Sequence, residues 1–383
     1  MDVIEKGILH KLEIPTRVYF GRGILEEGLE DVSKKSGILV NPILIVTTGG
    51  SLYRFGHIER LKNCISEINP DLEVYIYDGI RSNPTLQDVE CGISFAKENN
   101  IKSVIGFGGG SALDAAKAIA AGVVAETYIT NIFRKGEEPK DALPIIAIPT
   151  TAGTGSELSK AAILTDKERV RKGGLRGEKL YPDAAVVDSE FTETISLKVT
   201  METGFDVLAH AIEGYVSKAA SPFTKMLSEY VISNAGNSIK KLANDLYDVE
   251  AREQMSFSSM LMGINLGNTG TALPHRLQYP VGAHTNSSHA AGLAAMYPVW
   301  LKYESSYSPE EIKRIMGLLE IEEIEELIKY MGLRNSLEEI GVKQEMIDQM
   351  CEEVSGNLQN DPAFSEQDIV KKIYRESLYR EKK

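Results

Sequence analysis

The stretch GFGGGSALDAAK, Gly106–Lys117, joins the end of an expected strand to a glycine turn and a helix start. KSVIGFG (Lys102–Gly108) is an apolar run closed by glycine, which is typical of a strand buried on both faces. Ser111 opens an alanine-rich helical stretch that ends near Ala125. Glycines let the backbone approach a pyrophosphate closely, and free amides at a helix start favour an anion. The turn predicts a nucleotide site, although a tight strand-to-helix turn without a ligand explains the same residues.

Strands and helices alternate on both sides of this turn. Further expected strands are Pro42–Thr48, Leu72–Asp78, Leu143–Thr150 and Ala184–Phe191, with an expected helix over Thr85–Asn100. This alternation predicts a Rossmann-like parallel sheet with helices on both faces. From Thr200 onward the pattern is helical. We therefore expect an α/β domain over 1–191, an all-helical domain over 192–383, and a ligand cleft between them.

The composition excludes several classes of function. The 42 basic and 55 acidic residues give a net charge of −13, and no basic tract is present, which disfavours nucleic acid and anionic membranes as partners. No apolar run reaches the roughly 20 residues that span a bilayer, and the first residues lack a secretory pattern. Cys64, Cys91 and Cys351 are isolated, which suits a reducing cytoplasm and excludes a cysteine metal site. We expect a cytoplasmic protein with a small-molecule ligand.

Two other loops that follow expected strands are rich in glycine and hydroxyl side chains. The first lacks the acid that binds a ribose 2′-OH in many dinucleotide sites, and its small residues leave room for a 2′-phosphate beside Arg54. Those residues are Thr48, Gly49, Gly50 and Ser51. The second loop, Pro149–Ser159, has hydroxyls and amides suited to lining a cofactor. An ordinary Gly-Gly turn and a surface loop are the alternatives.

Four of the six histidines fall between residues 210 and 289. Asp206 and His210, at i and i+4, face one side of a helix. His275 and His289 lie 14 residues apart, and we expect the Pro-Val-Gly at 280–282 to break a helix, so that the two converge from separate segments. Three imidazoles and one carboxylate suit Fe(II) or Zn(II) with an open position. Structural histidines remain the alternative, because spacing does not establish convergence.

In this order the motifs resemble the iron-containing (group III) alcohol dehydrogenase family over nearly the whole chain. The motifs are FGRG (Phe20–Gly23), GGGSALDAAK, PTTAGTGSE, YPDAAVVD (Tyr181–Asp188), GFDVLAHAIEGYVS and the paired histidines. The resemblance implies a dehydroquinate synthase-like two-domain architecture and a homodimer or larger assembly. It also implies hydride transfer between a nicotinamide cofactor and an alcohol or aldehyde.

The resemblance implies site residues by position. The metal ligands match Asp206, His210, His275 and His289. The cofactor contacts match Gly108, Gly109, Gly110, Ser111, Asp114, Thr150 and Thr151, with Lys117 as the usual lysine of the motif. Many NAD-preferring members have Asp where this chain has Thr48, so the turn resembles the NADP-using branch. We expect NADP(H), with NAD(H) as the alternative.

One position departs from the family pattern. Four residues after the first histidine of the pair, many members have another His followed by Pro-Leu-Gly, and this chain has Tyr279. That histidine is usually assigned to substrate contact and proton relay. We expect Tyr279 or His284 to take this role. The alternatives are that Tyr279 only packs and that His284 is a polar loop side chain.

The substrate and the exact chemistry stay open at this stage. The family takes short alcohols, diols and aldehydes with anionic groups such as phosphono- or sulfoacetaldehyde. Arg276 could bind such an anionic tail, but it points about 100° away from His275 on a helix, which favours a surface salt bridge. The rivals are a glycerol-type polyol dehydrogenase, a dehydroquinate synthase-like enzyme, and a non-catalytic nucleotide-binding sensor.

Overall fold

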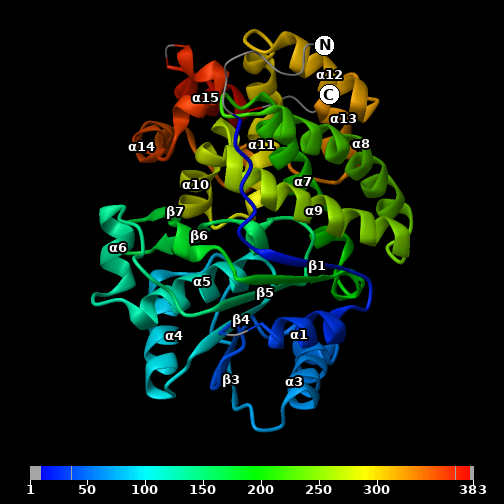
Figure 1. The fold of residues 1–383 in the computed structure, drawn as a ribbon. Helices are drawn as coiled ribbons and strands as arrows, with labels where there is room; N and C mark the ends of the chain where they lie inside the picture. The colour runs from blue at the N-terminus through cyan, green and yellow to red at the C-terminus, as the bar shows by residue number, and fades with distance from the viewer. Residues whose placement is uncertain (1–9, 36, 367, 380–383) are drawn as a thin grey trace. The chain divides into compact units, whose positions relative to one another are not determined.

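The structure, a computed structural model, describes residues 10–35, 37–366 and 368–379 (Figure 1). They form two compact units. The α/β unit is Ile14–Ile195, and the helical unit is Ser196 onward together with the described residues before Ile14. The boundary expected between residues 191 and 192 lies four residues ahead of this division.

Six parallel strands form the sheet of the α/β unit in the order β1-β8-β5-β4-β2-β3. The strands are β1 (Arg17–Gly21), β8 (Ala184–Asp188), β5 (Ile145–Pro149), β4 (Ser103–Gly108), β2 (Ile43–Val46) and β3 (Val74–Tyr77). The helices of this unit are α1 (Leu25–Ser33), α2 (Ser51–Arg54), α3 (His57–Ile68), α4 (Leu86–Glu98), α5 (Gly110–Val124) and α6 (Ile129–Lys135). The expected parallel sheet is confirmed.

Helices cover both faces of this sheet. Successive residues of a strand point to opposite faces, so each central strand contributes side chains to two cores. On β2, Ile43 and Ile45 pack in one core with α1 and α3, whereas Leu44 and Val46 pack in another with α4 and α5. Figure 1 shows the first pair of helices in blue and the second in cyan. Double-sided burial explains why the central strands read as continuous apolar runs.

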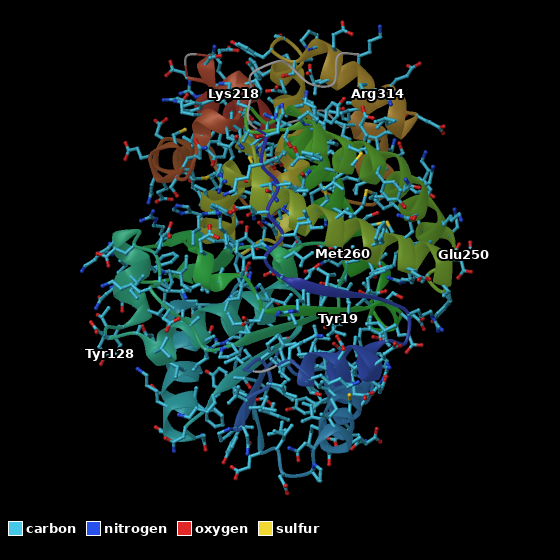
Figure 2. All side chains as sticks on the ribbon, viewed as in Figure 1. Tyr19, Tyr128, Lys218, Glu250, Met260 and Arg314 are labelled. Carbon is cyan, nitrogen blue, oxygen red and sulfur yellow. The ribbon has the colours of Figure 1, made fainter. Side chains whose placement is uncertain are left out.

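The edge strand β1 carries a polar link to the helix that covers it. Tyr19, labelled in Figure 2, donates its hydroxyl to Asp31 Oδ2 of α1 at 2.7 Å. Since β1 pairs with β8 on one side only, this bond gives the edge strand a further link to α1.

A second, antiparallel sheet of two strands was not expected. It consists of β6 (Ala161–Asp166) and β7 (Arg171–Arg176). The β7 sequence RKGGLR has no run of β-branched or aromatic residues, so it carries little strand signal. The pairing with β6 therefore determines the conformation of this segment.

The described residues of the helical unit contain helices and loops and no strand, so the all-helical prediction is confirmed. Its helices are α7 (Leu197–Val216), α8 (Pro222–Asn244), α9 (Val249–Thr269), α10 (Leu273–Thr285), α11 (His289–Glu304), α12 (Pro309–Leu319), α13 (Ile324–Tyr330), α14 (Ile347–Glu353) and α15 (Ile369–Leu378). Among the described residues we find no helix with the length and apolarity needed to cross a membrane.

The helix break expected at residues 280–282 is wrong, because α10 continues through Pro280 to Thr285. A proline inside a helix removes one backbone hydrogen bond, but Leu273–Gly282 is buried on every side, so packing outweighs that loss. The chain turns instead at Asn286, which has φ 53°, and Ser288 caps α11 by accepting a bond from the Ala291 amide. His275 and His289 therefore still lie on separate helices.

Candidate functional site

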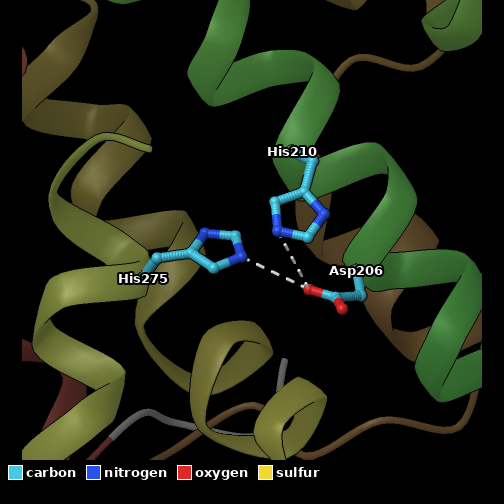
Figure 3. Close-up of side chains that lie close together, drawn as sticks. All are labelled: Asp206, His210 and His275. Carbon is cyan, nitrogen blue, oxygen red and sulfur yellow. Dashed lines mark hydrogen bonds and ion pairs between the residues drawn. The ribbon is translucent and has the colours of Figure 1, made fainter. Parts of the chain in front are cut away.

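Three histidines surround one carboxylate oxygen in the helical unit. Asp206 and His210 share a face of α7, one turn apart. The distances from Asp206 Oδ1 are 3.3 Å to His275 Nε2, 3.5 Å to His289 Nε2 and 3.9 Å to His210 Nε2. Figure 3 shows one carboxylate oxygen of Asp206 facing the rings of His210 and His275. These two rings stack with their centroids 4.3 Å apart. The convergence expected of the four residues is present.

This group fits a divalent metal ion. The ligand atoms of Asp206, His210 and His275 lie within 4.8 Å of one another, and all three residues are buried. The His289 side chain is 29% exposed, so the group is accessible from its side. One carboxylate and three imidazoles, with no thiolate among them, suit Fe(II) or Zn(II).

The charges of the group also favour a cation. Burial opposes the charged forms of both Asp206 and His275, but their partners outweigh it. The histidines hold the pKa of the Asp206 carboxyl well below its usual range, and Glu213 and Asp206 raise the pKa of His275 to about 10. Positive charge is therefore stabilised at the point where a metal would bind.

Glu213 is a residue of this site that sequence reasoning missed. It is fully buried on α7, and its Oε1 lies 2.6 Å from His275 Nδ1. A carboxylate that binds Nδ1 orients the ring and leaves Nε2 toward Asp206. Gln278 does the same for His289, with its Oε1 2.5 Å from Nδ1. The spacing of Asp206, His210 and Glu213 at i, i+4 and i+7 was the available signal.

The three other candidate residues of α10 lie in different surroundings. Tyr279 is buried and follows His275 by one turn of α10, so the two side chains share a face. His284 lies 2.6 Å from Glu353 Oε2 of α14 rather than beside Asp206. Arg276 is only 5% exposed. The surface position expected for Arg276 is therefore wrong, because Leu273–Gly282 of α10 is buried on every side.

In the α/β unit, the three glycine- and hydroxyl-rich loops follow adjacent strands. The chain leaves β2 toward β3 on one side and β4 toward β5 on the other. The carboxyl ends of β2 and β4 therefore flank the switch point at which such sheets bind ligands. Thr150 N donates to Gly108 O at 3.0 Å, and the space beside Gly109 is filled by Thr151. The predicted nucleotide residues after β4 and β5 thus form one surface.

The start of α5 can receive an anion. The helix begins at Gly110, its N-cap Gly109 offers no side-chain cap, and its first turn holds no acid. Its first amides therefore have no bond within the helix and carry the positive end of the dipole. A Cβ on Gly110 would lie 2.6 Å from Thr154 Cγ2, so only glycine allows this close approach of the two loops.

Asp114 and Lys117 hold the loop after β5 in place. Asp114 accepts bonds from Ser156 Oγ at 2.5 Å and from the Ile163 amide at 2.9 Å. Buried Lys117 donates from Nζ to the carbonyls of Ser156 and Ala161 at 2.8 and 2.6 Å. The structure gives both residues an anchoring role, while direct nucleotide contact by Asp114 stays a prediction.

The turn after β2 has an acidic neighbour that the sequence pattern did not indicate. Gly49 and Gly50 have φ of 64° and 59°, which explains the two glycines. Asp78, just after β3, accepts a bond from Tyr53 OH at 3.2 Å, and its Cβ would lie 3.5 Å from a Cβ on Gly49. The Asp78 carboxylate can accept a bond from a ribose 2′-OH, whereas Thr48 has no charge and leaves room for a 2′-phosphate.

Glu157, in the loop after β5, is expected to make the stability of the protein depend on pH. Burial raises its pKa to about 7, although Lys117 acts in the opposite direction. The folded protein then binds an extra proton between the ordinary glutamate pKa and about 7, so stability falls as pH rises through that window. We expect Glu157→Gln to raise Tm at pH 8 and to change it little at pH 5. The shift of the Glu157 pKa corresponds to roughly 3 to 4 kcal/mol.

Thermal unfolding followed by circular dichroism from pH 5 to pH 8 measures this effect. Glu98→Gln, at the exposed end of α4, is the control and should leave Tm unchanged across the range. An equal change of Tm at pH 5 and pH 8 in Glu157→Gln would contradict a titrating Glu157.

Comparisons with known proteins agree with this arrangement. A family model described as iron-containing alcohol dehydrogenase matches residues 15–189, and one described as the C-terminal part of the Fe-containing alcohol dehydrogenase family matches residues 200–378. An NADPH-dependent butanol dehydrogenase of Clostridium saccharobutylicum is 29% identical, covering 95% of this chain and 97% of its own. A probable NADH-dependent butanol dehydrogenase of Bacillus subtilis is 28% identical, covering 90% and 92%.

Solved structures give the same result. An iron-containing alcohol dehydrogenase of Thermotoga maritima superposes with a TM-score of 0.87 at 28% identity, covering 97% of this chain and 99% of that one. Both family models match in order and together span most of the chain. The chain therefore belongs to the iron-containing alcohol dehydrogenase family and is an oxidoreductase.

Proposed function

We propose that this protein is an Fe(II)-dependent enzyme that transfers hydride between NADP(H) and a small alcohol or aldehyde. The observation that carries the proposal is the approach of three imidazole Nε2 atoms to Asp206 Oδ1, at 3.3 to 3.9 Å. Membership of the family implies a metal and a nicotinamide cofactor. Zn(II) is the alternative metal, since the same donors accept it.

In this proposal Asp206, His210, His275 and His289 hold the metal. When bound, the metal supplies a Lewis acid that stabilises negative charge on the substrate oxygen, and the nicotinamide supplies or accepts the hydride. Glu213 and Gln278 keep two of the imidazole rings oriented.

Proton transfer is assigned to Tyr279. Its position one turn after His275 on α10 and its phenol group support this role, because a phenol can donate a proton or a hydrogen bond. His284 is the second candidate, and its bond to Glu353 would orient its ring.

The preference for NADP(H) rests on the turn after β2, where Thr48 stands in place of an acid. We expect Thr48→Asp to weaken NADPH binding at least 10-fold while changing NADH binding less, because a carboxylate repels a 2′-phosphate. Asp78→Asn should act in the opposite direction and favour NADPH. The measurement is the dissociation constant of each reduced cofactor by fluorescence titration. Equal effects of Thr48→Asp on the two cofactors would contradict the proposed role of the turn.

For the substrate, we propose a short uncharged alcohol or its aldehyde. The names of two relatives, both butanol dehydrogenases, support this choice. An aldehyde with an anionic tail and a glycerol-type polyol are the alternatives. The working form is proposed to be a homodimer or larger assembly in the cytoplasm, which light scattering and cell fractionation would test.

The test of the function is anaerobic NADPH oxidation followed at 340 nm with added Fe(II) or Zn(II) and a panel of neutral and anionic aldehydes, with NADH in parallel. We expect metal-dependent oxidation with short neutral aldehydes. Nucleotide and metal binding without turnover of any aldehyde would contradict the proposal and favour a non-catalytic sensor.

A further inference from the structure

A short segment near the end of the chain links the three helices that carry the four candidate ligands. It comprises Asn360 and Asp361, both buried, which join two short 3-10 helices at 358–360 and 362–365. We call these two residues the Asn-Asp tie. Nothing in the sequence pattern around them indicates a link to the metal centre.

Asn360 connects the end of α7 with the approach to α10. Its Oδ1 accepts a bond from Ser217 Oγ at 2.8 Å, just after α7, and the backbone amide of Lys218 (labelled in Figure 2) donates to its carbonyl at 2.9 Å. Its Nδ2 donates to the carbonyls of Thr269 and Thr271 at 2.8 and 3.1 Å. These bonds fix the loop from α9 to α10 against α7.

Asp361 connects α10 with α11. Its Oδ2 accepts one bond from the Leu273 amide and another from Trp300 Nε1, both at 2.9 Å. Leu273 is the first residue of α10, two positions before His275, and Trp300 lies on α11, which begins at His289. One carboxylate oxygen therefore contacts both helices that carry the paired histidines.

The start of α10 depends on this carboxylate. The N-cap residue Ala272 provides no side-chain cap, so remote groups must accept the first amides of the helix. Glu213 accepts the Ala272 amide at 2.9 Å, and Asp361 accepts the next one. Since Glu213 also binds His275, the first turn of α10 is held between two buried carboxylates.

Asp361 accepts a third bond besides those from Leu273 and Trp300. Its Oδ1 accepts the Ala363 amide at 2.9 Å. Three donors thus converge on one fully buried side chain, which a residue that only filled space would not require.

We propose that Asp361 is a positioning residue of the metal centre, which fixes the first turn of α10 against α11 and thereby sets the position of His275 relative to His289. This inference rests on the proposed function, because it takes the four residues around Asp206 Oδ1 to be metal ligands. The chemistry it predicts is a loss of metal affinity from a residue that touches neither the metal nor its ligands.

The test compares Co(II) binding by the wild-type chain with that of two substitutions. Removal of the residues that orient metal ligands weakens metal binding by about 10- to 100-fold, and we expect Asp361→Ala to fall in this range with altered Co(II) visible absorption bands. Asp361→Asn should lose clearly less affinity than Asp361→Ala, because its amide oxygen can still accept the Leu273 and Trp300 bonds, although its NH2 group cannot accept the Ala363 amide. Affinity is measured by competition with a chelator.

The control is Asp188→Ala. Asp188 is an equally buried carboxylate of the α/β unit that accepts the Gly23, Leu25 and Glu190 amides at 2.8, 3.2 and 3.1 Å. Its loss should lower Tm without changing Co(II) affinity. If Asp361→Ala does not fold, Trp300→Phe removes one donor to the same oxygen and should weaken Co(II) binding about threefold.

The outcomes separate this inference from the proposed function. Wild-type Co(II) affinity and spectrum in a folded Asp361→Ala or Trp300→Phe protein would overturn the positioning role while leaving the metal centre intact. Equal losses in the Asp361 and Asp188 variants would overturn it as well, since they would indicate general destabilisation. A wild-type chain that binds no Co(II) would overturn both proposals.

Discussion

Replacing His275 by alanine is expected to remove the bound metal and the activity together while leaving nucleotide binding unchanged. His275 has contacts on both ring nitrogens, since Nε2 lies 3.3 Å from Asp206 and Nδ1 lies 2.6 Å from Glu213. The substitution deletes a donor and leaves the buried Glu213 without that partner. Changes that only disorient a ligand weaken metal binding by 10- to 100-fold, so loss of the ligand itself should exceed about 100-fold.

Metal content by atomic emission, kcat/KM and the NADPH dissociation constant together measure this prediction. His284→Ala is the matched control for metal content, because His284 lies on the same helix and binds Glu353 instead of Asp206. Full activity in a metal-free His275→Ala protein would show that the four residues are not a catalytic metal site.

The second large effect is expected from Gly110→Val. A Cβ at this position would meet Thr154 at 2.6 to 3.0 Å, so the start of α5 and the loop after β5 must separate. The amides at this helix start are the proposed pyrophosphate site. We expect NADPH and NADH binding to weaken at least 10-fold each, with metal binding unchanged.

Isothermal titration of each nucleotide measures the effect of Gly110→Val. Gly317→Ala, in α12, is the control, since a Cβ there meets no atom within 4 Å, and nucleotide binding should not change. Normal nucleotide affinity in a folded Gly110→Val protein would place the pyrophosphate elsewhere.

The sequence predicts much of this fold because the strands of the sheet and the long helices have strong local patterns. The hairpin of β6 and β7 escaped prediction because RKGGLR at 171–176 has little strand propensity and depends on pairing. The helix break predicted at Pro280 is wrong for the opposite reason. The local preference of proline to end a helix is outweighed by the burial of α10 on every side. Tertiary packing decided both segments.

In the candidate site, too, some residues are predictable from local spacing and others are not. Asp206 and His210 are visible from their spacing on one helix, whereas the bond from His275 to Glu213 joins residues 62 positions apart and that from Leu273 to Asp361 joins residues 88 apart. No periodicity reveals such partners. The anchoring role of Asp114 is a further example, because its carboxylate binds Ser156 and the amide of Ile163, 49 positions away.

The most direct test of the metal centre is an anaerobic titration of the metal-depleted protein with Fe(II), in which bound iron and NADPH-dependent aldehyde reduction are measured on the same samples. We predict that activity rises in proportion to bound iron and stops at one equivalent per chain. Full activity before any metal is added, or one equivalent of bound iron without activity toward any aldehyde of the panel, would contradict a catalytic metal held by Asp206, His210, His275 and His289.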